Sequence, residues 1–488
     1  MALSIKPYIE NKERIHLIGI GGVSMNSLGE LLLSRGVPVS GSDRLKTDVT
    51  ARLEAKGAKI AYEHKAENVE GASLIVRTAA VHDDNPEIAR AHELGIPVME
   101  RAEAWGHLMR DYENVVCLAG THGKTTSTSM MTLMTMEAQM DPTVMVGSNL
   151  PAIGGTLRIG GKGCFVAESC EYCNSFLSFA PTVAVVLNVE EDHLDFFKDL
   201  NDIIHSFRGF VELTPMNGLV VVNGDDPNAM RCVDGLDRRI RTFGLNANAD
   251  VRATDIRDVN GYYRFTVLVD GAPYAKVELS VPGRHNMLNA LACCAAAEFL
   301  GVTGEAAARG LNKFTGSSRR FQLVGKMPNG ATVVDDYAHH PSEMRATLSA
   351  AREMGFDRIL CAFQPHTYTR TKALFDEFVE ALCLCDQAVL APIYAAREQN
   401  TIGIYSSDLA QKVPGAVALD SFAEIADYFK REAGANDLVL TMGGENSTGG
   451  GRLLIKKTCP RVKELRRFFL HRFFKKWLRE RKKMDKAP

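Results

Sequence analysis

A glycine-rich segment that ends in a lysine and hydroxyl residues carries the clearest chemical signal in the sequence. It follows the apolar stretch 115–118 and precedes a helical pattern rich in Ser, Thr and Met. Backbone amides of such a turn, the helix N-terminus and Lys124 can surround a triphosphate, while the Thr125 hydroxyl can coordinate Mg²⁺. The ordinary phosphate loop has four residues between its glycines and this one has two, so a shortened nucleotide-binding loop is predicted, with a chance Gly-Lys-Thr as the alternative. The loop consists of Gly120, Thr121, His122, Gly123, Lys124, Thr125 and Thr126.

A second glycine turn lies near the N-terminus. Gly19, Gly21 and Gly22 follow an apolar strand pattern, and Asp43 stands about 20 residues further on, at the end of the next predicted strand. Ser24 takes the place of the last glycine of the dinucleotide fingerprint. The turn therefore predicts a site for the diphosphate of a dinucleotide or of another nucleotide, with a purely structural turn as the alternative.

Acidic side chains and one histidine gather after two central apolar stretches. Glu168 ends the stretch 164–167, and His193 follows the stretch 183–189. Acidic runs are commonly solvated surface, but the carboxyl ends of parallel strands are where α/β sheets bind ligands. Carboxylate oxygens and one imidazole beside a triphosphate suit Mg²⁺. The cluster consists of Glu168, Glu171, Asp192, His193 and Asp195.

Two further polar clusters follow strand patterns in the last third of the chain. Residues 335–341 read Asp-Asp-Tyr-Ala-His-His-Pro, and residues 364–370 read Gln-Pro-His-Thr-Tyr-Thr-Arg. Such groups at strand ends are typical of ligand sites, with ordinary loop capping as the alternative.

The elements that position these residues follow an α/β pattern. Apolar runs of strand length alternate with helical patterns, which predicts parallel sheets flanked by helices. Residues 250–282 differ, because alternating polar and apolar residues with Asn-Gly and Asp-Gly turns indicate antiparallel hairpins. We interpret these hairpins as an insertion in a second α/β domain. Strand candidates at 332–335, 359–363, 388–391 and 438–441 indicate a third.

Length and composition favour a multidomain protein without a signal peptide or a membrane-spanning segment. With 488 residues and a net charge of −2, the chain can hold about three domains and has no overall bias towards nucleic acid. Residues 1–14 lack the apolar core of a signal peptide, and no apolar run reaches the ~18 residues that span a bilayer. We expect a cytoplasmic protein whose 11 cysteines are reduced thiols. The sequence gives no indication of oligomeric state.

The C-terminal segment 456–488 is strongly basic, with 14 Lys or Arg residues against three acidic ones. Val462, Leu465, Phe469, Phe473 and Trp477 recur there at helical spacing. A basic amphipathic helix can lie on an anionic membrane, and it can equally pack its apolar face on the third domain. Both interpretations stay open.

Taken together, the motifs resemble the Mur ligase family over about residues 12–455. The ordered motifs are GIGGVSM from Gly19, GTHGKTT from Gly120, EEDHLD from Glu190, PGRHNMLNA from Pro282, and DDYAHHP with QPHTYTRT in the last third. One departure is Gly-Gly-Glu-Asn at residues 443–446, where the family usually has Gly-Ala-Gly-Asp-Ile. The resemblance implies a Rossmann-like UDP-sugar domain at 1–112, a P-loop-type ATPase domain with a mainly parallel sheet at 113–317, a Rossmann-like amino-acid domain at 318–455, and the tail 456–488.

The resemblance also implies roles for individual residues. UDP-sugar positions are Gly19, Gly21, Gly22, Ser24 and Asp43. ATP positions are Gly120 to Thr126, Asn286, Asn289, Arg320 and Asp336. Magnesium positions are Thr125, Glu168 and His193. Positions near the amino acid or the reacting groups are Tyr337, His339 and Arg370. Candidate catalytic residues are Lys124, His193, Arg320, Asp336, His339 and Arg370.

The activity implied is ATP-dependent joining of L-alanine to the carboxylate of UDP-N-acetylmuramate, through an acyl phosphate. The alternatives are a family member that adds another amino acid or a peptide, a non-catalytic UDP-sugar binder, and a nicotinamide-dependent dehydrogenase that uses the first glycine turn. The last alternative leaves the lysine loop and the acidic cluster without a role.

Overall fold

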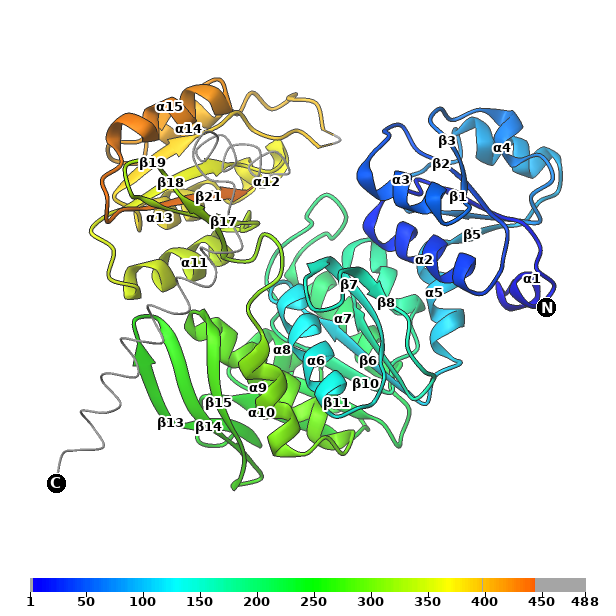
Figure 1. Cartoon of the computed structure of the whole chain (residues 1–488), viewed down its shortest axis with the longest axis horizontal. Helices are drawn as coiled ribbons and strands as arrows, with labels where there is room; N and C mark the ends of the chain where they lie inside the picture. Colours follow the sequence, from blue (N-terminus) through cyan, green and yellow to red (C-terminus); the bar gives the residue numbers. More distant parts are fainter. Residues whose placement is uncertain (1–2, 397, 444–488) are drawn as a thin grey trace. The chain divides into compact units, whose positions relative to one another are not determined.

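The computed structural model describes residues 3–396 and 398–443. The chain divides into two compact units, of which the first ends at Ser318 and the second begins at Arg319 (Figure 1). The basic segment 456–488 and residues 444–446 of the departing motif lie outside the described residues.

The first unit opens with a five-stranded parallel sheet in the order β3-β2-β1-β4-β5. The strands are β1 (Ile15–Ile18), β2 (Val39–Ser42), β3 (Lys59–Ala61), β4 (Leu74–Arg77) and β5 (Val98–Glu100). The helices are α1 (Lys6–Glu10), α2 (Val23–Ser34), α3 (Asp48–Ala55), the 3-10 turn η1 (Ala66–Val69), α4 (Pro86–Glu93) and α5 (Arg101–Met109). Every residue of β1 and β2 is buried, as expected of central strands covered by helices on both faces.

A ten-stranded sheet forms the rest of the first unit, in the order β15-β14-β13-β12-β11-β10-β6-β9-β7-β8. The strands are β6 (Asn114–Ala119), β7 (Thr143–Leu150), β8 (Gly155–Arg158), β9 (Cys164–Glu168), β10 (Val183–Val186), β11 (Leu219–Asn223), β12 (Ile240–Gly244), β13 (Val251–Val259), β14 (Tyr262–Val269) and β15 (Ala272–Pro282). The helices are α6 (Lys124–Glu137), the 3-10 segment η2 (Tyr172–Ser178), α7 (Leu200–Glu212), α8 (Pro227–Arg231), α9 (Arg284–Phe299) and α10 (Gly304–Lys313).

The predicted hairpins are present as β13, β14 and β15, which pair antiparallel. They extend the edge of the ten-stranded sheet rather than forming a separate layer, because β13 also pairs in parallel with β12. The strand predicted over 183–189 is shorter than expected. It ends at Val186, after which the side chain of Asn188 bonds to the backbone of His122.

Helix α6 is buried almost all round although its sequence is rich in hydroxyl residues. Thr128, Ser129 and Thr132 each donate a side-chain hydrogen bond to the backbone carbonyl four residues earlier, at 2.7–2.8 Å. Because these hydroxyls are satisfied within the helix, their burial does not leave polar atoms without partners. The helix that follows the lysine loop can therefore sit inside the unit, where α9 and α10 pack against it.

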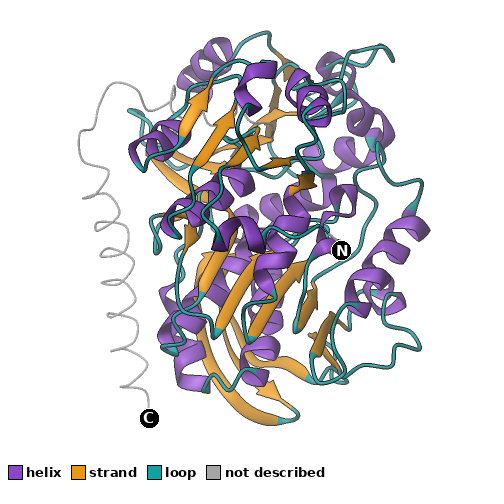
Figure 2. Cartoon of the chain, turned by 90° about the vertical axis from the view of Figure 1, so that its right-hand side faces the viewer, coloured by secondary structure: helices purple, strands orange, loops and turns teal. Residues whose placement is uncertain are grey.

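The second unit contains a six-stranded sheet in the order β16-β17-β21-β18-β19-β20, parallel except for β16. The strands are β16 (Gln322–Lys326), β17 (Thr332–Asp336), β18 (Ile359–Gln364), β19 (Gln387–Leu390), β20 (Val417–Ala418) and β21 (Leu438–Gly443). The helices are α11 (Pro341–Glu353), α12 (Tyr368–Ala373), α13 (Phe375–Leu382), α14 (Ser406–Ala410) and α15 (Phe422–Glu432). Figure 2 shows helices lying against the strands within each unit.

The α/β class predicted from the sequence is confirmed, with three sheets that are mainly parallel. Every cysteine among the described residues is a free thiol, and most are buried. Within residues 3–396 and 398–443, no helix combines the length and apolar character that crossing a membrane requires.

Candidate functional site

The lysine loop connects β6 to the first residue of α6. Two glycines give it its shape: Gly120 has φ +148° and Gly123, at the N-cap of α6, has φ +83°. A side chain is excluded at both, since a Cβ on Gly120 would lie 2.9 Å from the Leu187 Cβ and one on Gly123 would lie 2.6 Å from the Asn289 Oδ1. The loop is thus held tightly at the N-terminus of a buried helix, which is the arrangement that binds phosphate groups.

Lys124 points back into this loop. Its Nζ donates to the Gly120 carbonyl at 2.5 Å, to the Thr121 carbonyl at 3.0 Å and to both carboxylate oxygens of Glu171 at 3.0 Å. Burial disfavours the charge of Lys124, but the neighbouring Glu171 outweighs it and raises the pKa of the lysine above its ordinary value. Glu171 is itself only 2% exposed, so each charge supplies the other's main compensation.

Glu168 lies at the end of β9 and faces the start of α6. The Thr125 hydroxyl donates to its Oε1 at 2.9 Å, and the Gly147 amide donates to its Oε2 at 2.6 Å. Hydroxyl and carboxylate oxygens side by side are the hard donors that Mg²⁺ prefers. The donor set of Thr125 and Glu168 therefore fits this ion.

His193 lies beside the other carboxylate of the cluster. Its Nε2 is 3.7 Å from Glu171 Oε1, and its ring packs against Tyr172 with 4.7 Å between centroids. The backbone of His193 has φ +54°, and its amide donates to Asp192 Oδ1 at 2.7 Å. Of the predicted cluster, Glu171 and Asp192 thus lie beside His193, and Glu168 pairs with Thr125 of the lysine loop. Asp195 accepts from the Tyr172 hydroxyl at 2.8 Å. Lys124 is attracted by both Glu168 and Glu171.

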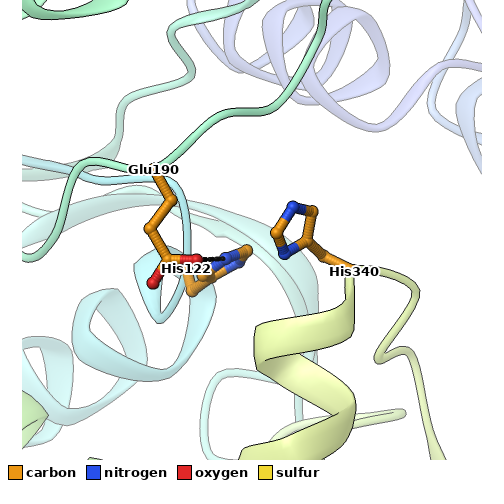
Figure 3. A group of neighbouring side chains, drawn as sticks. All are labelled: His122, Glu190 and His340. Carbon is orange, nitrogen blue, oxygen red and sulfur yellow. Dashed lines mark hydrogen bonds and ion pairs between the residues drawn. The ribbon is translucent and has the colours of Figure 1, made fainter. Parts of the chain in front are cut away.

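The segment after β10 holds the other side of the lysine loop. Asn188 accepts from the His122 amide at 2.7 Å and donates to the His122 carbonyl at 3.1 Å. The His122 ring lies 3.3 Å from Glu190 (Figure 3), whose amide donates to the Thr121 hydroxyl at 2.9 Å. Sequence reasoning missed Asn188, although its place directly after a predicted strand is the kind of signal that identified His193.

The two asparagines at the start of α9 are buried, each 6% exposed. Asn286 donates to the Pro282 carbonyl at 2.7 Å and accepts from Asn289 at 3.2 Å. Because Asn289 also lies against Gly123, the structure brings α9 to the lysine loop.

The first glycine turn connects β1 to α2 and is held by the end of β2. The amides of Gly19 and Ile20 both donate to the Ser42 carbonyl, at 2.8 and 3.0 Å. The Gly21 amide donates to Asp43 Oδ2 at 2.8 Å. Gly22 is the N-cap of α2.

Ser24, by contrast, faces the ten-stranded sheet. Its hydroxyl lies 3.5 Å from the Met145 sulfur, and its carbonyl accepts from the Trp105 indole at 3.3 Å. These contacts give Ser24 a packing role that the sequence pattern did not suggest.

In the second unit, Asp336 ends β17 and organises the backbone around it. Its oxygens accept from the Phe321 and Ala338 amides, both at 2.7 Å. Burial outweighs the attraction of Arg320 and raises the pKa of Asp336 to about 6.

Aromatic and cationic side chains gather beside Asp336. The Arg320 guanidinium lies 5.4 Å from the Tyr337 ring centroid, and the His339 ring lies 4.9 Å from it. His339 also lies 5.5 Å from His366, whose Nδ1 is 3.1 Å from Arg370 Nη1. The second unit therefore brings together all five of its predicted residues and His366, which belongs to the predicted cluster 364–370. It adds Arg319, which no sequence motif indicated.

The chain matches three family models in succession. They are the Mur ligase family catalytic domain over residues 14–113, the Mur ligase middle domain over residues 118–297, and the Mur ligase glutamate ligase domain over residues 319–444.

Individual proteins agree with these models. The UDP-N-acetylmuramate--L-alanine ligase of Acetivibrio thermocellus is 48% identical over 91% of this chain and 96% of that protein. The protein of the same name from Agathobacter rectalis is 46% identical over 91% and 98%. Among solved structures, the UDP-N-acetylmuramate-alanine ligase of Thermotoga maritima superposes with a TM-score of 0.77 and 28% identity, covering 91% of this chain and 98% of that one. The three matched domains and the identity across nine-tenths of its length show that the chain belongs to the Mur ligase family.

Proposed function

We propose that the protein is a ligase of peptidoglycan precursor synthesis that uses ATP to join L-alanine to the carboxylate of UDP-N-acetylmuramate. The observation that carries the proposal is the 48% identity, over 91% of the chain, with a relative that bears the name of this reaction. The geometry of the lysine loop supports the ATP-dependent part. By this function the protein acts in the cytoplasm, where ATP is available.

The first unit would bind two nucleotides at its two glycine turns. Gly19, Gly21, Gly22 and Asp43 would face the UDP moiety. The amides of Gly19 and Gly21 are held within the turn, so the first-turn amides of α2 would take the diphosphate. Ser24 would support the same turn from behind. ATP would bind at residues 120–126, with Asn286 and Asn289 beside them.

Thr125, Glu168 and His193 would hold the magnesium ion. Bound there, Mg²⁺ supplies positive charge that offsets the charge of the phosphoryl oxygens. Of these residues, Thr125 and Glu168 have the oxygen donors the ion prefers, and they lie 2.9 Å apart.

Lys124 would stabilise the phosphoryl group during transfer. Its ammonium is held within the loop by two carbonyls and Glu171, so its charge already lies at the N-terminus of α6. These acceptors take its three protons, so a phosphoryl oxygen would replace one of them.

The second unit would contribute the remaining charged groups. Arg320 and Asp336 would contact ATP, while Tyr337, His339 and Arg370 would contact the amino acid or the reacting carboxyl. For function we propose domains at 1–112, 113–317 and 318–455, although the first two form one compact unit.

The reaction has two steps. A carboxylate oxygen of the sugar acid attacks the γ-phosphorus of ATP in line, so that an acyl phosphate forms and ADP leaves. The neutral amine of alanine then attacks the acyl carbon, loses a proton, and displaces inorganic phosphate through a tetrahedral intermediate. No enzyme nucleophile is required, since positioning and charge neutralisation carry phosphoryl transfer.

Phosphate release from ATP tests the proposal. The purified protein is supplied with Mg²⁺, ATP and UDP-N-acetylmuramate, and then with L-alanine, glycine, L-serine or a peptide in turn. Release that depends on L-alanine above the others supports the proposal. A preference for a peptide would identify a different ligase of the family, and binding of the UDP-sugar without release would identify a non-catalytic binder. A dehydrogenase would instead bind NAD(H) without UDP-sugar or ATP binding.

A further inference from the structure

A buried carboxylate lies behind the first glycine turn, at the start of α4. Glu87 is 0% exposed, and none of the sequence motifs includes it. Its Oε2 accepts from the Ser42 hydroxyl at 2.7 Å and lies 2.9 Å from His64 Nδ1. Its Oε1 accepts from Asn68 Nδ2 at 2.6 Å. One carboxylate thus connects four separate parts of the N-terminal sheet region.

A second histidine completes this cluster. His16, on β1, is 1% exposed, and its Nε2 lies 3.5 Å from Glu87 Oε1 while its Nδ1 lies 3.0 Å from the Ser40 hydroxyl. We call His16, Ser42, His64, Asn68 and Glu87 the Glu87 cluster. Its members come from β1, β2, the loop after β3, η1 and α4.

The cluster requires Glu87 to be ionised. Burial would raise the pKa of Glu87, but the hydrogen bonds from the surrounding donors outweigh it and lower the pKa to about 2. The Ser42 hydroxyl gives its single proton to Glu87 Oε2. Because a carboxylate only accepts, His64 must carry its proton on Nδ1 to make its own contact. The Ser42 hydroxyl and the His64 Nδ1 proton therefore both point at the Glu87 carboxylate.

Ser42 links this cluster to the glycine turn. While its hydroxyl is bound by Glu87, its backbone carbonyl accepts from both Gly19 and Ile20. The next residue is Asp43, which accepts from the Gly21 amide. Just before Ser42, β2 runs so close to β1 that a Cβ on Gly41 would lie 2.6 Å from the Leu17 carbonyl oxygen, so only glycine fits there. Because the Gly19 and Ile20 amides donate to the Ser42 carbonyl, a shift of Ser42 would move the turn with it.

We propose that Glu87 is a positioning residue for the sugar-nucleotide site, which holds Ser42 and, through the Ser42 carbonyl, keeps the first glycine turn in its binding arrangement. This inference rests on the proposed function, because it takes the turn to bind UDP-N-acetylmuramate. Because Glu87 is fully buried, it would act without touching the ligand. It lowers the cost of ordering the turn when the ligand binds.

The test compares Glu87→Gln and Ser42→Ala with wild type in the full-length enzyme. Glutamine has nearly the same shape, but its amide nitrogen cannot accept from the donors on that side. Each variant should raise the KM for UDP-N-acetylmuramate by about 3- to 10-fold, the effect of leaving one or two side chains to be ordered on binding. The KM for ATP and kcat at saturating UDP-sugar should stay within about twofold of wild type. Glu93→Gln, an exposed carboxylate on the same helix that pairs with Arg90, is the matched control and should change none of these constants.

The double variant tests whether Glu87 and Ser42 affect UDP-sugar binding through the same contact or independently. If Glu87 acts through Ser42, the KM of Glu87→Gln/Ser42→Ala should be no higher than that of the more affected single variant. The inference is overturned if the two KM increases multiply in the double variant, or if kcat and ATP affinity fall together. Glu87 would then stabilise the fold without a specific effect on the sugar-nucleotide site.

Two further outcomes keep the inference falsifiable. Should Glu87→Gln fail to fold, Ser42→Ala carries the test, and an unchanged KM in that variant overturns the inference. A direct titration of wild-type enzyme with UDP-N-acetylmuramate tests the proposed function separately. If wild type does not bind this ligand, the proposed function is wrong, whatever the variants show.

Discussion

Both carboxylate oxygens of Glu171 lie 3.0 Å from the ammonium nitrogen of Lys124; Glu171 is buried and Lys124 is partly buried. The pair has two consequences, one for activity and one for stability, because Lys124 is also the residue that we propose to contact phosphate.

Replacing Lys124 by alanine should lower the rate of phosphate release by at least about 100-fold, as removal of one preorganised electrostatic contact does in other enzymes. It should also lower the thermal midpoint, because Glu171 is left as an uncompensated buried charge, at a cost of roughly 3–5 kcal/mol. Steady-state assays and thermal unfolding of the same preparations measure both effects. Lys162→Ala, at an exposed loop lysine, is the control.

A double variant separates the two consequences. Lys124→Met/Glu171→Gln removes both charges, so it should recover most of the lost thermal midpoint and none of the lost activity. Activity that returned together with stability would mean that Lys124 acts only as the partner of Glu171.

Thr125→Val should raise the Mg²⁺ concentration needed for half-maximal activity by about 10- to 100-fold, since it would delete one of the proposed metal ligands while preserving shape. Magnesium titrations at saturating ATP measure the shift. Thr128→Val is the matched control, because that hydroxyl is buried in the same helix and donates to the Lys124 carbonyl at 2.8 Å. Equal magnesium dependence of the two variants would remove Thr125 from the metal site.

The free energy of unfolding should fall as the pH rises through the titration of Asp336. Its pKa is about 6 in the folded protein against 3.8 ordinarily. Between these values the folded protein keeps a proton that the unfolded chain has released, so raising the pH destabilises the fold, by on the order of 3 kcal/mol in total. The stability of wild type relative to Asp336→Asn should therefore fall as the pH rises from about 4 to about 6 and level off above.

Unfolding in denaturant across this pH range measures the effect. The exposed Asp376→Asn should keep the wild-type slope. A relative stability that rose with pH would mean that Asp336 has a lowered pKa and is held as an ion pair.

Gly106→Ala should destabilise the first unit. A Cβ at this position of α5 would lie 1.8 Å from the Ser178 carbonyl oxygen at the end of η2, so the backbone must move. We expect a loss of about 1–3 kcal/mol, as for other overpacked contacts. Gly155→Ala is the control, because nothing lies within 4 Å of a Cβ there. If both variants unfold at the same temperature, the contact between α5 and η2 does not limit stability.

The parts of the fold and site that are formed by residues close together in the sequence could be predicted. The strand, glycine turn and helix around Lys124 occupy consecutive residues, and Asn-Gly and Asp-Gly turns identify the hairpins β13–β15 without knowledge of their neighbours. Part of the group around Tyr337 could be predicted in the same way, because Tyr337 and His339 follow β17 and Arg370 follows β18 of a mainly parallel sheet. Arg320 precedes β16 and follows no strand pattern, so only the family resemblance identified it.

Contacts between distant segments could not be predicted in this way. Glu87 looks like an ordinary acidic residue in the first turn of a helix, and only the assembled sheet brings His16, Ser42 and His64 to it. The same holds for Ser24, whose contact with Met145 joins residues 121 positions apart. Nothing in the local sequence distinguishes such residues from solvated ones.

Transfer of a labelled oxygen tests the central claim most directly. UDP-N-acetylmuramate labelled with ¹⁸O in its carboxylate is incubated with the enzyme, Mg²⁺, ATP and L-alanine, and the inorganic phosphate is analysed by mass spectrometry. Because the carboxylate oxygen that attacks phosphorus leaves with the phosphate, each phosphate molecule should carry one oxygen from the sugar acid. Phosphate without label, formed along with the amide product, would contradict activation through an acyl phosphate.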